Sequence, residues 1–261
     1  MMSWVYDLPI WLASIVYIGG MSALAAAGVL LVRRGVAHRA ITHNDVAGPI
    51  MATLGTVLAV MLSFMVVTMW QEYDNASSFV AQEASDIADL YHESAIFPEP
   101  IRGEVQAALR HYVALVIRDE WPRMRDGRES AATRLAAIRA VTLVQQYQPT
   151  TLGQQTAQAD ALAHAHGFLD ARRQRLFANS ESVPRLLWAM MIFISIVTLG
   201  SAYFFRVDNP RAHLLMTVAL AAVIGAIFVL IAELDLPFRG PMQIAPSAFA
   251  KDYTAFSDTL P

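Results

Sequence analysis

Long stretches without charged residues alternate with polar stretches along this chain, and they form two pairs separated by about a hundred polar residues. Each uncharged stretch holds at least 20 residues, enough for a helix to cross a hydrocarbon core of roughly 30 Å. The uncharged stretches are residues 8–32, 46–71, 186–205 and 212–232. Because such lengths have no stable place in water, the pattern predicts a polytopic membrane protein with four transmembrane helices.

The expected fold class is all-α, in a two-plus-two arrangement with a helical polar insert between two helix pairs. Helix one is expected over about 9–32 and helix two over about 46–70. Helix two is expected to continue toward Ser94, because residues 71–94 contain neither Pro nor Gly. The predicted parts are a first helix pair (1–70), an extramembrane insert (71–182), a second helix pair (183–233) and a Pro-containing tail (234–261).

The insert is predicted to be helical throughout. A helix over 104–121 is expected to stop at Pro122, and a second is expected over 129–148. Thr151 and Gln154 match a capping box at the start of a third helix. Three leucines spaced by seven residues predict a packing stripe on that third helix. They are Leu162, Leu169 and Leu176.

The outer boundaries follow from local signals. Pro184 is expected to begin helix three, and Asn209 with Pro210 is expected to form the turn into helix four. No basic residue precedes the first apolar stretch, and that stretch is longer than the core of a secretory signal. The first stretch is therefore interpreted as a retained transmembrane helix.

Composition supports the membrane class and excludes several others. The residues are 56% hydrophobic and 16% charged, and the mean hydropathy is +0.41. A net charge of −3 gives no nucleic-acid footprint, and the absence of Cys excludes disulfides and thiolate metal sites. No catalytic motif is present, so we expect no enzyme, no cofactor and no metal site. The expected partners are the lipid bilayer and further copies of the chain.

Two opposite orientations in the membrane are supported by different features of the sequence. The positive-inside rule, led by the first helix, places the short connectors in the cytoplasm and the insert with both termini outside. The bases of the short connectors are Arg33, Arg34, Arg39, Arg206 and Arg211, against five or six on the other side. The family resemblance described below implies the opposite orientation. In either case we expect an integral protein of a bacterial inner membrane.

Polar side chains form a stripe along helix two. At 100° per residue, Thr53, Thr56, Ser63 and Gln71 fall within an arc of about 80°. Such hydroxyls either bond within the helix bundle or line a water-filled pore, and both interpretations stay open. In the pore interpretation the lining residues are Thr53, Thr56, Val60, Ser63, Phe64, Val67 and Gln71, and the pore mouth is formed by Glu72 and Asp74.

Charged and titratable residues elsewhere offer weaker signals. In the tail, Glu233 and Asp235 could pair with Arg239, bind a cation or be solvated. A basic group on the last insert helix is expected to be solvated or to face lipid headgroups. It consists of Arg172, Arg173 and Arg175. His164 and His166 diverge by about 200° on a helix, so these two cannot share a metal ion.

Four segments resemble a bacterial and plant family of membrane proteins described as bestrophin-like. They are His43–Gly48, Trp70–Tyr73, Glu83–Asp86 and Glu233–Gly240. The last segment is also similar to the sequence that follows the final membrane helix of bestrophins. It departs from that pattern, because Arg239 stands between Phe238 and Gly240 and no acidic calcium-binding run follows.

The resemblance implies a function. Bestrophins are pentameric ion channels, mostly selective for anions, whose second helix lines the pore and whose insert and termini are cytosolic. By this resemblance five copies would surround one axis, with Phe64 at the constriction, although bestrophins repeat aromatic rings where helix two has a single Phe. The leading hypothesis is an oligomeric channel for small ions, either anions or ions without selection. The alternative is a membrane sensor or scaffold whose insert binds a ligand or a partner protein.

Overall fold

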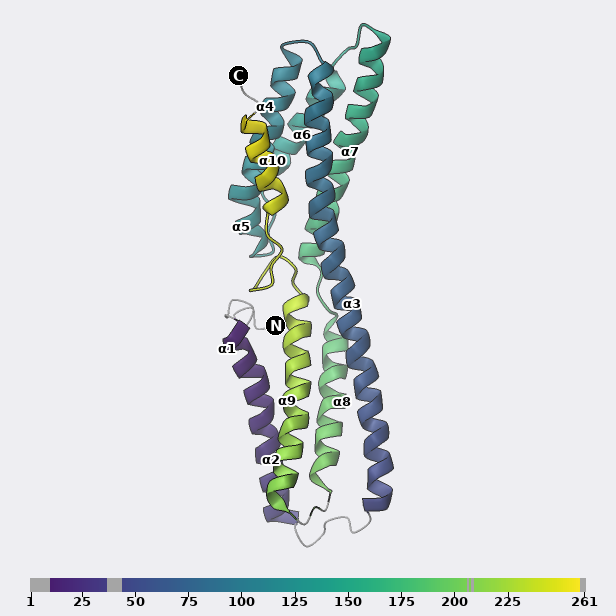
Figure 1. Ribbon diagram of the computed structural model, residues 1–261, viewed down its shortest axis with the longest axis vertical. Coiled ribbons are helices and arrows are strands. Elements are labelled where there is room, and N and C mark those ends of the chain that lie inside the picture. The colour runs from purple at the N-terminus through teal and green to yellow at the C-terminus, as the bar shows by residue number, and fades with distance from the viewer. Residues whose placement is uncertain (1–9, 37–43, 206, 208, 259–261) are drawn as a thin grey trace. The chain divides into compact units, whose positions relative to one another are not determined.

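The computed structural model describes residues 10–36, 44–205, 207 and 209–258, and every regular element in these ranges is a helix (Figure 1). The described chain divides into two compact units. The spanning-helix unit comprises residues up to 71, 182–236 and 240–242. The polar helical unit comprises 72–181, 237–239 and residues from 243 onward. The all-α prediction is confirmed for the described residues.

Among the described residues, four helices are long and apolar enough to cross a membrane, which confirms the four predicted spans. The first span, Ile15–Arg34, is formed by the π-helical segment η2 (Ile15–Gly19) and most of α2 (Gly20–Val36), and the short helix α1 (Ile10–Ser14) precedes it. The second span lies in α3 (Asn44–Glu93), and the last two are α8 (Arg185–Tyr203) and α9 (Pro210–Leu234). Helix α9 begins as predicted, because the side-chain oxygen of Asn209 accepts hydrogen bonds from the backbone N–H groups of Arg211 and Ala212.

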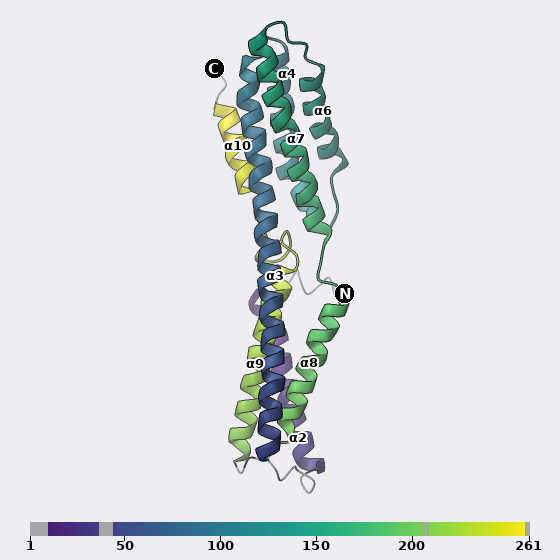
Figure 2. The same ribbon diagram turned by 90° about the vertical axis from the view of Figure 1, so that its right-hand side faces the viewer.

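Helix α3 continues without a break from the spanning-helix unit into the polar helical unit (Figure 2). The helix contains 50 residues. The prediction that helix two extends toward Ser94 is therefore confirmed, since α3 ends at Glu93 and a 3-10 turn, η3 (Ser94–Ile96), follows.

Glycines allow close helix contacts in the spanning-helix unit. A Cβ atom added at Gly225 of α9 would lie 3.0 Å from the Cα atom of Ile18 and 3.1 Å from the carbonyl oxygen of Tyr17. The first helix and α9 thus approach backbone to backbone at this point. A Cβ atom added at Gly28 of α2 would overlap the ring of Tyr203. Small residues permit such close approaches between membrane helices.

The polar helical unit contains α4 (Ile101–Leu115), the π-helical segment η4 (Val116–Glu120), α5 (Trp121–Met124), α6 (Ala131–Gln146), α7 (Leu152–Ser180) and α10 (Ser247–Asp258). One apolar core joins the second part of α3 to α4, α6, α7 and α10. The predicted stop at Pro122 was wrong, because the helical path runs to Met124. The π turn changes the hydrogen-bond register, and Pro122 falls in the first turn of α5, where its missing N–H is tolerated.

Two local predictions for α7 agree with the structure. Thr151 caps the helix, since its hydroxyl oxygen accepts a hydrogen bond from the backbone N–H of Gln154 at 3.2 Å. The return bond differs from a full capping box, because the Gln154 side chain accepts from Thr150 and not from Thr151. The three leucines of the predicted stripe are partly buried against the core of the unit. They are Leu162, Leu169 and Leu176.

Candidate functional site

The first part of α3 has two contrasting faces. Its apolar residues Leu58, Leu62, Met65 and Met69 are buried, with at most 8% of each exposed. At 100° per residue these four positions fall within an arc of about 60°. The seven residues predicted to line a pore lie on the opposite side and are all exposed. They are Thr53, Thr56, Val60, Ser63, Phe64, Val67 and Gln71. This side of α3 is therefore open in the single chain.

Phe64 dominates the open side of α3. Its side chain is 70% exposed, although burial of such a large apolar ring away from water is favourable in free energy. Further along the same helix, Glu72 and Asp74 are also exposed. In chain order the open side thus presents hydroxyls, then an apolar ring, and then the Gln71 amide and the Asp74 carboxylate, whereas Glu72 leaves the helix in another direction.

The two threonine hydroxyls of this side are satisfied within the helix. Thr53 donates to the carbonyl oxygen of Pro49 at 3.0 Å, and Thr56 donates to that of Ala52 at 2.8 Å. These bonds use the hydroxyl protons, while the hydroxyl oxygens can still accept hydrogen bonds. Intrahelical bonding and contact with water are therefore compatible at both residues.

The two acidic residues at the C-terminal end of α9 bond to backbone groups of their own unit. Asp235 is buried, and its carboxylate accepts a hydrogen bond from the backbone N–H of Val183 at 2.6 Å. Glu233 is half-buried and accepts a hydrogen bond from the backbone N–H of Met242. Asp235 thus ties the end of α9 to the segment that leads into α8, which fits a structural role for this carboxylate.

The next tail residues belong to the polar helical unit. The ring of Phe238 packs edge-on against Trp121, with 5.7 Å between the ring centroids. The side chain of Arg239 packs against Gly127, whose φ of 70° and missing Cβ leave room for the guanidinium. The Trp121 indole N–H donates to the carbonyl oxygen of Ile244 at 3.1 Å. Residues 237–239 therefore anchor the tail to this unit.

Two arginines and two glutamates form a buried ion-pair network in the polar helical unit. Arg175 is fully buried, and its guanidinium lies 2.7 Å from one Glu83 carboxylate oxygen and 2.8 Å from a Glu120 oxygen. Arg172 bonds to the second Glu120 oxygen, and the Tyr112 hydroxyl donates to Glu83. The formal charges cancel, so burial does not leave an isolated ion.

Electrostatics and aromatic rings hold the central guanidinium. Burial alone lowers the pKa of Arg175, but the carboxylates of Glu83 and Glu120 outweigh burial and keep that pKa above its ordinary value. The guanidinium also lies 5.2 Å from the ring centroid of Trp121 and 5.8 Å from that of Phe249. Arg175 is therefore a charged group of the core.

The expectation for the basic group on α7 was therefore wrong for two of its three members. Arg172 and Arg175 are buried in the network, whereas Arg173 is exposed and pairs with Asp170. The helical period explains the difference, because positions 172 and 175 share one face of α7 and position 173 turns away. No local signal in the sequence sets Glu83 and Glu120 apart, because polar residues such as Gln82 and Asp119 stand beside them.

A family model described as the Bestrophin-like domain matches residues 19–249. The chain belongs to the bestrophin-like family. The crystal structure of a bacterial Bestrophin homolog from Klebsiella pneumoniae is similar to this bestrophin-like chain, with a TM-score of 0.67, 12% identity and coverage of 95% of this chain and 98% of that chain. A mutant of that homolog gives a TM-score of 0.68, 13% identity and the same coverage. No curated protein matches the chain.

A third similar structure is a membrane protein with a TM-score of 0.66 and 14% identity, covering 95% of this chain and all of that chain. At these identities the structures show a shared fold. Together with its four apolar helices, family membership makes this bestrophin-like chain an integral membrane protein.

Proposed function

We propose that this bestrophin-like protein is an ion channel in which several copies surround a pore lined by the open side of α3. Family membership supports a channel over an enzyme. The observation that carries the proposal is the contrast on α3: one face is buried in its own unit, and the opposite face leaves seven residues exposed. A membrane-spanning face that carries hydroxyls and an amide is better satisfied by water than by lipid.

The proposed assembly keeps the layout expected from the sequence. Two transmembrane helix pairs flank the polar helical segment, and the assembly is a homo-oligomer, with a pentamer favoured by the resemblance to bestrophins. The permeating species are small ions, with anions as the first candidates on the same ground. Phe64 would narrow the pore and gate it by dewetting, since an apolar ring at a narrow neck disfavours a water column. Glu72 and Asp74 would stand at the mouth.

Removal of the Phe64 ring tests the proposal. In planar bilayers, Phe64→Ala is expected to raise the unitary conductance or open probability several-fold, because a methyl group no longer dewets the neck. The matched control is Phe193→Ala on α8, another exposed phenylalanine of the same unit at 61% exposure. That control is expected to leave both quantities unchanged. If well-folded oligomer shows no conductance in planar bilayers, or if both substitutions have equal effects, the proposal that α3 lines a pore is refuted.

The proposed orientation places the polar helical unit and both termini in the cytoplasm, as in bestrophins, and not outside as the charge rule suggests. The chain contains no Cys, so single-cysteine variants can be labelled selectively. Leu152→Cys, at a position 78% exposed in the polar helical unit, is expected to react with a membrane-impermeant maleimide only after cells are permeabilised. Arg211→Cys, at the start of α9, is expected to react in intact spheroplasts. The reverse pattern would establish the orientation from the charge rule.

A further inference from the structure

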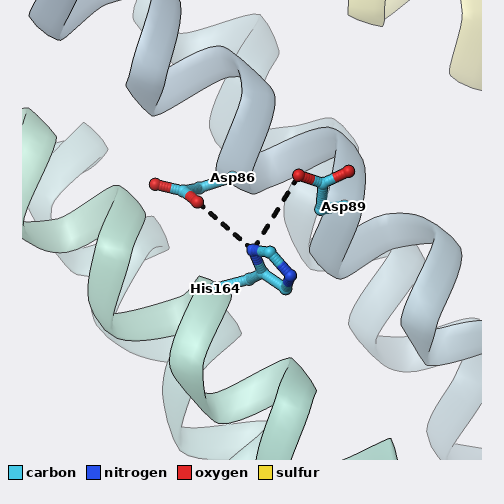
Figure 3. A group of neighbouring side chains, drawn as sticks. All are labelled: Asp86, Asp89 and His164. Atoms are coloured by element: carbon cyan, nitrogen blue, oxygen red, sulfur yellow. Dashed lines mark hydrogen bonds and ion pairs between the residues drawn. The ribbon is translucent and has the colours of Figure 1, made fainter.

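Three side chains that can each supply a metal ligand meet between two helices of the polar helical unit (Figure 3). Asp86 and Asp89 stand on α3, and His164 stands on α7. The Nδ1 atom of His164 lies 3.2 Å from an Asp86 carboxylate oxygen and 3.9 Å from an Asp89 carboxylate oxygen. The three ligand atoms all lie within 4.8 Å of one another.

Residue spacing on α3 and a glycine on α7 bring these three side chains together. Asp86 and Asp89 are three residues apart, so both carboxylates leave α3 on the same side. On α7, Gly167 makes the approach possible, because a Cβ atom there would lie 2.6 Å from an Asp86 carboxylate oxygen. The Gln82 side-chain amide donates to that same oxygen at 3.0 Å. One oxygen of Asp86 is thus held by the hydrogen bond from Gln82, and the other faces His164 (Figure 3).

The distances suit a bound ion as well as a direct contact. Zinc lies about 2.0–2.2 Å from nitrogen and carboxylate ligands, so two ligands in a tetrahedral arrangement lie about 3.4 Å apart. The 3.2 Å separation between Asp86 and His164 is close to this spacing. The Asp89 oxygen, at 3.9 Å from the imidazole nitrogen, is too far for a hydrogen bond. A small rotation of the Asp89 side chain would complete a three-ligand set.

The exposure of the three side chains increases from one side of the group to the other. The side chain of Asp86 is 9% exposed, that of His164 is 33% exposed, and that of Asp89 is 52% exposed. The inner carboxylate provides a desolvated anchor, and the outer one lies where an ion enters from water. Three protein ligands with an open outer side leave at least one coordination position for water, as in zinc sites that are not purely structural.

We propose that Asp86, Asp89 and His164 bind a divalent first-row transition-metal ion of the zinc class. Two carboxylates give the group a charge of −2, which a dication neutralises. The imidazole ligand favours zinc-class ions over Mg²⁺ and Ca²⁺, which prefer oxygen ligands alone. Bound metal would link α3 to α7 within the polar helical unit. The site does not depend on the proposed conduction.

The competing interpretation is an ion pair between protonated His164 and the two carboxylates. Both interpretations require the same neighbours, but they differ at Asp89. In the ion pair Asp89 is a distant and exposed partner that contributes little, whereas at a metal site it is one of three ligands. They also differ in the response to added metal, since a protonated imidazole cannot bind an ion.

Isothermal titration of the detergent-solubilised, metal-stripped full chain with ZnCl₂ tests the site. We expect one zinc ion per chain with micromolar affinity, and no comparable heat with MgCl₂ or CaCl₂. Asp89→Asn and His164→Gln are each expected to weaken zinc binding by about tenfold or more, since even partners outside the ligand shell matter by about tenfold. The matched control is His166→Gln, an exposed histidine on the same helix, which should keep the wild-type affinity.

Asp89→Asn protects the test against a folding artefact, because this exposed side chain supports no core contact and the helical circular dichroism should not change. Zinc should also raise the thermal midpoint of the wild-type chain and not that of His164→Gln. The proposal would be overturned by absent zinc heat, by binding that survives both ligand substitutions, or by equal loss in His166→Gln. Any of these results would leave only an ion pair between His164 and Asp86. An absence of conductance in planar bilayers would not affect the zinc-binding result, because the site does not depend on conduction.

Discussion

Replacement of Arg175 by Met is expected to lower the thermal midpoint of the detergent-solubilised protein by about 10 °C. The substitution keeps an unbranched side chain of similar reach but removes the charge that Glu83 and Glu120 face inside the core. Removing one partner from a buried ion-pair network lowers the free energy of unfolding by about 3–5 kcal/mol, because the remaining carboxylates lose their opposite charge. Circular dichroism at 222 nm, used as a helix signal, would follow the unfolding.

The matched control lies two residues away on the same helix. Arg173 is 77% exposed and pairs with Asp170 at the surface, and surface pairs of this kind contribute at most about 1 kcal/mol. Arg173→Met should therefore change the midpoint by no more than about 3 °C. Equal midpoints for the two variants would show that removal of the Arg175 charge does not leave a destabilising uncompensated carboxylate in the core.

The spanning helices could be predicted from the sequence because a bilayer imposes a length on uncharged stretches that no other environment requires. The extension of α3 to Glu93 was predictable for a related reason, since nothing in that stretch interrupts a helix. Local caps behaved in the same way at Asn209 and Thr151. These signals lie within a few residues of one another, so they do not depend on knowing the tertiary structure.

The features that failed depend on residues far apart in the chain. Local periodicity relates His164 only to His166 two positions on, whereas its partner Asp86 lies 78 positions away in sequence. Arg175 was assigned to a solvated face, although its partner Glu83 is 92 positions away. A charge on a helix can be placed in a core only when the opposite charge on another helix is known. The stop at Pro122 failed because a π turn shifted the register just before it.

Gly225→Val is expected to destabilise the spanning-helix unit by about 2 kcal/mol or more. The reason is steric: a Cβ atom at this position already lies 3.0–3.1 Å from backbone atoms of Ile18 and Tyr17, and the two further methyl groups would force the first helix away from α9. Backbone atoms cannot move aside as a flexible side chain can. The thermal midpoint and the yield of monodisperse protein in detergent should both fall.

Gly200→Val on α8 is the matched control, because a Cβ atom there would meet nothing within 4 Å. Both substitutions introduce the same β-branched side chain into a transmembrane helix, so changes in helix propensity are shared by the pair. Only the contact with the first helix differs between them. A Gly200→Val variant that loses as much stability as Gly225→Val would mean that the loss arises within each helix. Stability retained by Gly225→Val would mean that the close approach of the first helix to α9 contributes little to the fold.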